Sequence, residues 1–191
     1  MHQILITCRE ALTAAVALVP IFWFLNRRMI HDPKKSTLYL IFSIYLSAMY
    51  AAVGLPDVTY WRFHVNTNFI PFLYMFSAWE STLLNVLLFV PLGFFMPILC
   101  RAYHSPGRTL LLGFGLSAAI EFLQIFTYRA SDINDLMTNT VGTMVGYSIA
   151  ILAKKAFPAI CPVDTNQDIP LIFAVSFGTM FFIYPFLLRF L

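Results

Sequence analysis

The sequence predicts an all-α, polytopic transmembrane helical bundle with five to six spans, in a single domain over residues 1–191. Three observations lead to this fold class. Hydrophobic residues make up 60% of the chain and charged residues only 11%, and the mean hydropathy is +0.77. The apolar residues also gather in six stretches, each close to the roughly 20 residues that a helix needs to cross a bilayer.

The predicted spans cover residues 4–25, 37–55, 78–99, 109–128, 136–156 and 169–188. The first is the weakest, because Arg9 and Glu10 interrupt it and leave fifteen uncharged residues behind them. Its cations Arg27 and Arg28 follow the apolar run, whereas those of a cleaved signal peptide precede it. We therefore expect this stretch to be retained. If it spans, both termini lie on the same side.

Positive charges predict the orientation. Cytoplasmic connections of membrane proteins are enriched in Lys and Arg. Eight of the twelve such residues lie in or beside the connections 26–36, 100–108 and 157–168: Arg27, Arg28, Lys34, Lys35, Arg101, Arg108, Lys154 and Lys155. We assign these connections to the cytoplasm. The net charge of +3 comes from these flanking cations, so no nucleic-acid partner is expected. Three scattered cysteines indicate neither a disulfide framework nor a metal site.

The segment between the second and third spans, residues 56–77, is rich in aromatic residues. Its apolar run at 69–78 is too short to cross a bilayer. Trp and Tyr concentrate at the depth of lipid headgroups, so we expect an interfacial or re-entrant segment. Ser77 and Glu80 match a capping box, which predicts that the third helix begins near Ala78.

Polar residues recur at three- and four-residue steps in the fourth and fifth spans, which puts each set on one helical face. The sets are Ser117, Glu121, Gln124 and Tyr128, and Asp132, Asp135, Asn139, Gly142 and Gly146. The tight connection between the spans makes these helices antiparallel neighbours. Each helix would turn its polar face toward the bundle and away from lipid.

A rise of about 1.5 Å per residue puts Asn85, Glu121 and Asn139 at the same depth, roughly 10 Å below the outer boundary. Arg129 and the two aspartates would surround the mouth above them. The sequence therefore predicts a polar pocket that opens to the outside. The candidate binding residues are Asn85, Gln124, Arg129, Asp132, Asp135 and Asn139.

Most of these residues also have a purely structural interpretation. Asp132 fits an N-cap, and Asp135 lies in a first turn, where the helix dipole favours a carboxylate. Arg129 fits an ion pair with either aspartate. Asn85 fits a hydrogen bond between helices, and Gly142 and Gly146 fit close helix packing.

Glu121 has the strongest functional case. A carboxylate at this depth must be protonated, paired or hydrated. Each of these states needs a specific environment. Glu121 is therefore the candidate catalytic acid or base.

The sequence resembles the VanZ-like family over residues 68–150. The motifs that carry the resemblance are Asn68-Phe69-Ile70-Pro71-Phe72, Asn85 with Phe89-Val90-Pro91-Leu92-Gly93, Glu121-x-x-Gln124, and the series Arg129, Asp132, Asp135, Asn139, Gly142 and Gly146. The resemblance implies a small bacterial integral membrane protein. The family's namesake is associated with resistance to teicoplanin, a lipidated glycopeptide that acts at the outer membrane face.

The leading hypothesis is a protein of the cell membrane whose outward-facing pocket binds or processes an amphiphile. The expected partners are membrane lipids, polyprenyl-linked cell-wall precursors or a lipoglycopeptide, with a contribution to teicoplanin resistance. Arg129 would bind an anionic headgroup through its two-pronged guanidinium. Glu121 and Gln124 would contact the polar part below it. Binding alone and acid–base chemistry at Glu121 both fit this hypothesis.

Three alternatives remain. A metal-assisted hydrolase or transferase would hold a divalent cation at Glu121, Asp132 and Asp135; otherwise no cofactor is expected. A proton or ion carrier would use Glu121, although the inner halves of the spans offer no polar path. In a non-catalytic membrane scaffold, the polar residues would only hold helices together.

Overall fold

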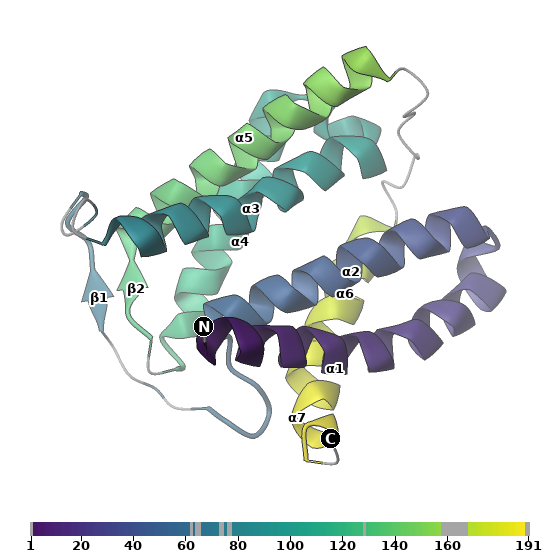
Figure 1. The fold of residues 1–191 in the computed structure, drawn as a ribbon, viewed down its shortest axis with the longest axis horizontal. Helices are drawn as coiled ribbons and strands as arrows, with labels where there is room; N and C mark the ends of the chain where they lie inside the picture. Colours follow the sequence, from purple (N-terminus) through teal and green to yellow (C-terminus); the bar gives the residue numbers. More distant parts are fainter. Residues whose placement is uncertain are drawn as a thin grey trace. The chain divides into compact units, whose positions relative to one another are not determined.

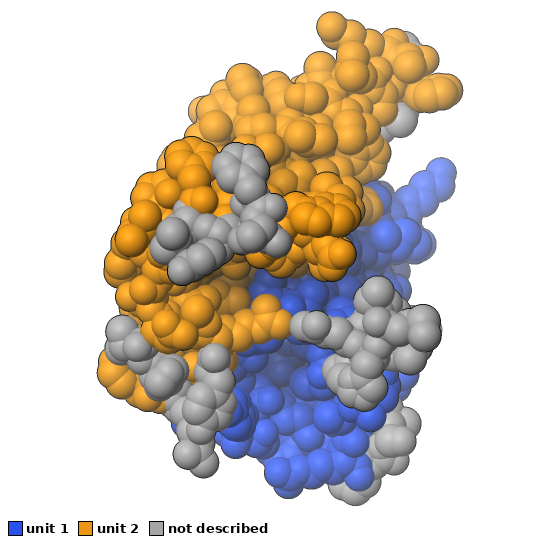
Figure 2. Space-filling view, turned by 60° about the vertical axis from the view of Figure 1, so that its left-hand side comes forward, with its two compact units in different colours: residues 1–61, 167–191 blue, residues 62–166 orange. Residues whose placement is uncertain are grey.

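The computed structural model describes residues 2–61, 63, 66–72, 75, 78–127, 129–157 and 168–189. The chain divides into two compact units, which Figure 2 shows in different colours. Unit one comprises residues 1–61 and 167–191, and unit two comprises residues 62–166. The single domain expected over the whole chain stays a prediction.

Unit one is built from three helical stretches of the chain. They are α1 (His2–Leu25), continued by the π-helical η1 (Asn26–Ile30); α2 (Pro33–Val53); and α6 (Ile169–Gly178), continued by the π-helical η3 (Thr179–Ile183) and by α7 (Tyr184–Leu187). Figure 1 shows α1 and α2 side by side. Phe22, Phe42, Leu46 and Ile172 are fully or almost fully buried and form part of the core of this unit.

The start of α2 shows how local sequence sets a helix boundary. His31 has a left-handed backbone conformation (φ 54°), which ends η1. Asp32 then caps α2, because its Oδ1 accepts the N–H groups of Lys34 and Lys35 at 2.9 and 3.3 Å. Pro33 occupies the first helical position, where its missing N–H has no cost. The helix therefore begins before the apolar run that predicted it.

Unit two contains the remaining elements. They are β1 (Thr67–Asn68), α3 (Trp79–Leu99), the 3₁₀ turn η2 (Arg101–His104), α4 (Pro106–Gln124), β2 (Ser131–Asp132) and α5 (Ile133–Ala156). The two short strands pair in parallel. Figure 1 shows α3 and α5 running side by side.

Glycines bring α3 and α5 unusually close together. A Cβ atom on Gly142 would collide with the Val86 carbonyl, and one on Gly146 would collide with the Val90 carbonyl. The small-residue packing predicted for Gly142 and Gly146 is confirmed. The contact positions increase together along both helices, so α3 and α5 are parallel.

Five described helical segments are long and apolar enough to cross a membrane: Arg9–Ile30, Pro33–Val53, Trp79–Leu99, Ile133–Ala156 and Ile169–Leu187. This confirms an all-α, multi-pass membrane protein with five to six spans. The first candidate begins at Arg9 and continues through Arg27 and Arg28, so it lies further along the chain than predicted. The capping residue expected for α3, Ser77, lies outside the described residues, and Trp79 is the first residue of that helix.

The helix α4 is absent from those five segments, although the sequence predicts a span there. Its polar residues Ser117, Glu121 and Gln124 lower its hydropathy, and all three are buried. Two parallel spans need a return crossing between them, and α4 connects α3 to α5. Its 19 residues extend about 28 Å at the α-helical rise. We therefore treat α4 as the sixth crossing.

Candidate functional site

The predicted polar residues gather at one end of unit two. The helices α3 and α5 are parallel, and α4, which connects them along the chain, runs in the opposite direction. The N-terminal ends of α3 and α5 therefore lie at the same end as the C-terminal end of α4. The pairing of β1 with β2 also lies at this end, with Thr67 opposite Ser131 and Asn68 opposite Asp132. The predicted contact between α4 and α5 is confirmed.

Glu121 holds the end of α4 to the start of α5. Its side chain is only 8% exposed, and its Oε2 accepts the backbone N–H of Asp132 at 2.8 Å. The hydroxyl of Ser131 also lies within hydrogen-bonding reach of the carboxylate. Glu121 therefore has a structural partner that the sequence did not predict, beside any functional role.

Asp132 has the capping role that its position suggested. Its Oδ1 accepts the N–H of Asn134 at 2.8 Å, at the first turn of α5. The same oxygen accepts the side-chain amide of Asn68 at 3.1 Å. Asp132 thus joins β1 to α5 and contributes to the order of the whole site.

Two further hydrogen bonds connect the three helices. Asn85 on α3 donates to Oδ1 of Asp135 on α5 at 2.6 Å, which confirms a link between helices at Asn85. Asn139 on α5 donates to the hydroxyl of Ser117 on α4 at 2.9 Å. The Asn139 side chain is 3% exposed, and its Oδ1 is buried with no hydrogen-bond partner among the described residues.

Gln124 is also buried, at 4% exposure, whereas Arg129 is exposed in the turn before β2. The backbone N–H of Arg129 donates to the Thr127 hydroxyl at 3.3 Å. Its guanidinium is close enough to interact electrostatically with the Asp135 carboxylate. Tyr128, the last residue of the polar set predicted in the fourth span, lies outside the described residues.

The part of the chain that the structure describes contains no group of three His, Cys, Asp or Glu side chains arranged to hold a metal ion. Glu121, Asp132 and Asp135 influence one another electrostatically. Their oxygens, however, bind protein N–H donors from Asp132, Asn134 and Asn85. The geometry therefore gives no support to the metal-assisted alternative.

The site includes two residues that the sequence did not select as candidates, Asn68 and Asn134. The Oδ1 of Asn134 accepts the N–H of Phe72 at 2.7 Å, and the Oδ1 of Asn68 accepts the N–H of Ile70 at 3.1 Å. Asn134 was missed because it falls between the three- and four-residue steps of the polar set predicted in the fifth span. Its position beside a helix cap was the available signal.

These bonds fix an apolar loop to the polar site. The backbone of the loop is also held where the N–H of Ser131 donates to the Asn66 carbonyl at 2.9 Å. In contrast, the side chains of Phe69, Ile70 and Phe72 are 72%, 60% and 56% exposed. The loop 66–72 therefore presents apolar side chains from a backbone that is held firmly, which agrees with an interfacial segment.

Replacing Asn85 or Asp135 by Ala is expected to lower the free energy of unfolding, because either change breaks the link between α3 and α5. The double variant should lose less than the sum, with a coupling of about 1 kcal/mol. Denaturant titration of the four proteins in detergent measures this coupling. Asp135→Asn keeps the acceptor oxygen and serves as the control. Additive losses would contradict the assigned bond.

The fold and site define a class, a small multi-pass helical membrane protein with a polar site at one end of a parallel helix pair. A model of the VanZ/LLP1 family matches residues 36–154, more than half of the chain. The chain belongs to this family. The match includes the stretch 68–150 and also most of α2. Searches of curated proteins and of solved structures return no match.

Proposed function

We propose that the polar site of unit two binds the polar part of an amphiphile at the outer face of the cell membrane. One observation carries the proposal. Two acidic side chains, the buried Glu121 and the half-buried Asp135, lie near each other at one end of a helix bundle, with no hydrogen bond to Lys, Arg or His among the described residues. Acidic groups at such positions in membrane proteins generally serve function.

The chemistry of the site favours a ligand rich in hydrogen-bond donors. Glu121, Asp135 and the buried Oδ1 of Asn139, which has no hydrogen-bond partner among the described residues, are acceptors that suit sugar hydroxyls or amines. Arg129 at the edge of the site suits a phosphate or carboxylate. A lipid-linked cell-wall precursor carries both kinds of group, and a lipoglycopeptide carries sugars, amines and a carboxylate.

The apolar loop 66–72 supplies a surface for the lipid part of the ligand. Phe69, Ile70 and Phe72 are exposed, and Asn68 and Asn134 hold the loop against the acidic site. An amphiphile at this position would place its headgroup at Glu121 and its chain beside the phenylalanines. The site thus places acceptors for a polar headgroup beside an apolar surface for a lipid chain.

Unit two also supports the outward orientation. Arg101, Arg108, Lys154 and Lys155 all lie at the ends of α3, α4 and α5 that are opposite to Glu121. Lys and Arg mark the cytoplasmic side. The site is therefore proposed to face the outside.

A cysteine at Ala130, in a background with Cys8, Cys100 and Cys161 replaced by Ser, is expected to react with a membrane-impermeant maleimide in intact cells. Ala130 is exposed beside the site. Gly107→Cys, at the opposite end of α4, is the matched control and should react only after the cells are opened. The reverse pattern would overturn the orientation.

The proposed binding is tested by purifying the full chain in native nanodiscs and identifying its lipids by mass spectrometry. The wild type is expected to enrich an amphiphile over the surrounding membrane, and Glu121→Gln is expected to lose that enrichment. Glu80→Gln, an exposed carboxylate in the first turn of α3, is the control. Identical lipid profiles for wild type and Glu121→Gln would contradict the proposal.

A contribution to teicoplanin resistance follows from this proposal if the bound amphiphile is the antibiotic or its target. Expression of the wild type in a susceptible bacterium is then expected to raise the inhibitory concentration of teicoplanin. Glu121→Gln should remove the increase, while Glu80→Gln should retain it. An increase that is independent of Glu121 would contradict a role for the site.

A membrane scaffold is the second candidate. It is favoured by three hydrogen bonds that each connect separate elements. They join Asn85 to Asp135, Asn139 to Ser117, and Glu121 to Asp132. A scaffold would keep the same lipid profile in the Glu121→Gln variant, so the nanodisc experiment separates the two.

A further inference from the structure

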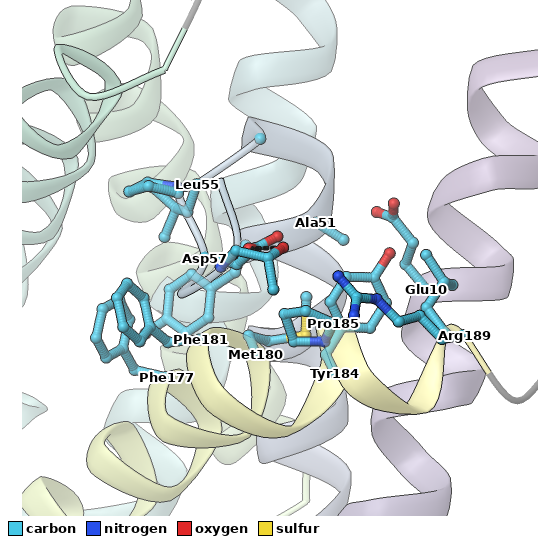
Figure 3. A pocket seen from close by; sticks show the side chains of 15 residues that line it. Glu10, Ala51, Leu55, Asp57, Phe177, Met180, Phe181, Tyr184, Pro185 and Arg189 are labelled. Atoms are coloured by element: carbon cyan, nitrogen blue, oxygen red, sulfur yellow. Dashed lines mark hydrogen bonds between the residues drawn. The ribbon is translucent and has the colours of Figure 1, made fainter. Parts of the chain in front are cut away.

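Unit one contains a cavity that none of the predicted site residues lines. Its volume is about 430 Å³, within the range of roughly 300–1,000 Å³ that is usual for small-molecule pockets. The walls come from α1, from the end of α2 with the loop that follows it, and from the stretch formed by α6, η3 and α7. Figure 3 shows these walls from close by.

Three charged side chains line the cavity, and each lies at the end of a candidate span. Glu10 follows directly after Arg9, where the first span begins, and Asp57 comes shortly after the second span ends at Val53. Arg189 follows the end of the last span at residue 187. The cavity therefore lies at the depth of lipid headgroups.

The charges in this cavity are of both signs and lie too far apart to form ion pairs with one another. No ion pair joins Arg189 to Glu10 or Asp57 among the residues that the structure describes. Glu10 has the Tyr184 hydroxyl within hydrogen-bonding reach. Separated charges of opposite sign are complementary to a zwitterion.

Asp57 has a structural role that limits its part in binding. Its Oδ1 accepts the N–H and the hydroxyl of Thr59, both at 2.7 Å, and the N–H of Tyr60 at 2.9 Å. These bonds shape the loop at the rim of the cavity. Glu10 is therefore the principal acceptor for a ligand cation.

The opposite side of the cavity is aromatic. Phe177 and Phe181 stack with ring centroids 5.5 Å apart, and Tyr50 packs edge-on against Phe177. Behind this lining, Trp61 packs edge-on against Phe181. Because the rings contact one another, they form an apolar wall and not an open cage for a quaternary ammonium group. Figure 3 shows Phe177 and Phe181 on one side of the pocket and Glu10 and Arg189 on the other.

We propose that this cavity binds a phospholipid with a primary amine in its headgroup, of the phosphatidylethanolamine class. Arg189 binds the phosphodiester, Glu10 accepts hydrogen bonds from the ammonium group, and the glycerol and acyl carbons lie along Phe177 and Phe181. A choline headgroup offers no N–H donor to Glu10. Glu10 and Arg189 lie outside the family match, so this lipid site is independent of the function proposed for unit two.

The test uses the full chain in nanodiscs of equal phosphatidylethanolamine and phosphatidylcholine, with retained lipids counted by native mass spectrometry. The wild type is expected to retain the ethanolamine lipid about ten-fold over the choline lipid, the factor that one charge-assisted hydrogen bond contributes. Glu10→Gln should bring this ratio close to one. Arg189→Gln should reduce retention of both lipids, because both carry the phosphodiester, and leave the ratio in place. Glu80→Gln is the control for a carboxylate at a span end outside the cavity.

A wild-type ratio near one would overturn the proposal, as would an unchanged ratio in Glu10→Gln or an equal loss in Glu80→Gln. A competition on the wild type alone avoids any folding defect of the variants. Soluble phosphoethanolamine is expected to displace the retained lipid at about ten-fold lower concentration than soluble phosphocholine, by the same hydrogen bond. Equal potency would overturn the headgroup assignment. Phosphoethanolamine that binds without displacing lipid would overturn the lipid assignment.

Discussion

Gly146→Leu is expected to prevent the native packing of α3 against α5 and to produce a large loss of folded protein. A Cβ atom at this position already collides with the Val90 carbonyl and crowds the backbone of Phe94. Neither obstacle is the end of a flexible side chain, so relief requires the helices to separate. Overpacking in protein cores typically costs about 1–3 kcal/mol, and separation would also break the Asn85–Asp135 bond.

The measurement is the yield and the thermal midpoint of the protein in detergent. Gly115→Ala is the matched control, because a Cβ atom at Gly115 meets nothing within 4 Å. Alanine is also the better helix former, by about 1 kcal/mol, so this control should be as stable as the wild type or more so. A Gly146→Leu protein with wild-type yield and midpoint would contradict the close parallel pair.

Replacement of Glu121 is expected to separate its structural role from its functional role. Glu121→Gln keeps a side-chain oxygen that can accept the N–H of Asp132, so stability should change little. Glu121→Leu removes the acceptor and leaves that N–H without a partner, which costs about 1–3 kcal/mol. Both variants remove the carboxylate and should lose the enriched amphiphile.

Thermal midpoints and lipid profiles of the three proteins, measured together, test this prediction. The expected order of stability is wild type close to Gln, then Leu, whereas binding should be present only in the wild type. A Gln variant as unstable as the Leu variant would mean that the charge itself holds α4 to α5. Retained enrichment in the Leu variant would exclude Glu121 from the site.

The hydropathy of the chain was enough to predict the class of fold and the approximate position of each helix. The boundaries were less accurate, because they depend on caps such as Asp32 and Asp132 and on prolines at first helical positions such as Pro33. The parallel arrangement of α3 and α5 was not predicted. It depends on contacts such as that of Gly146 with Val90. The periodicity of one helix does not show which other helix it packs against.

Periodicity put the polar residues of α4 on one face and those of α5 on one face, but it gave no information on their partners. The bond between Glu121 and the backbone of Asp132 joins a side chain to a peptide group, which a pattern of side-chain types does not reveal. Asn134 does not belong to the predicted polar set of the fifth span, and its side chain still accepts the N–H of Phe72 in the loop. The cavity at Glu10 and Arg189 joins two ends of the chain that no local pattern connects.

Photo-crosslinking in living cells is a direct test of amphiphile binding beside Glu121. A benzophenone amino acid would replace Phe69, which is 72% exposed on the loop bound to the site, or Phe157, which is 65% exposed at the far end of α5. Irradiation followed by mass spectrometry of the intact protein gives the mass of the attached molecule. A specific adduct is expected at position 69 and should disappear with Glu121→Gln, whereas position 157 should give only bulk lipid that is unaffected by Glu121. The same bulk lipid at both positions, with no dependence on Glu121, would contradict amphiphile binding beside Glu121.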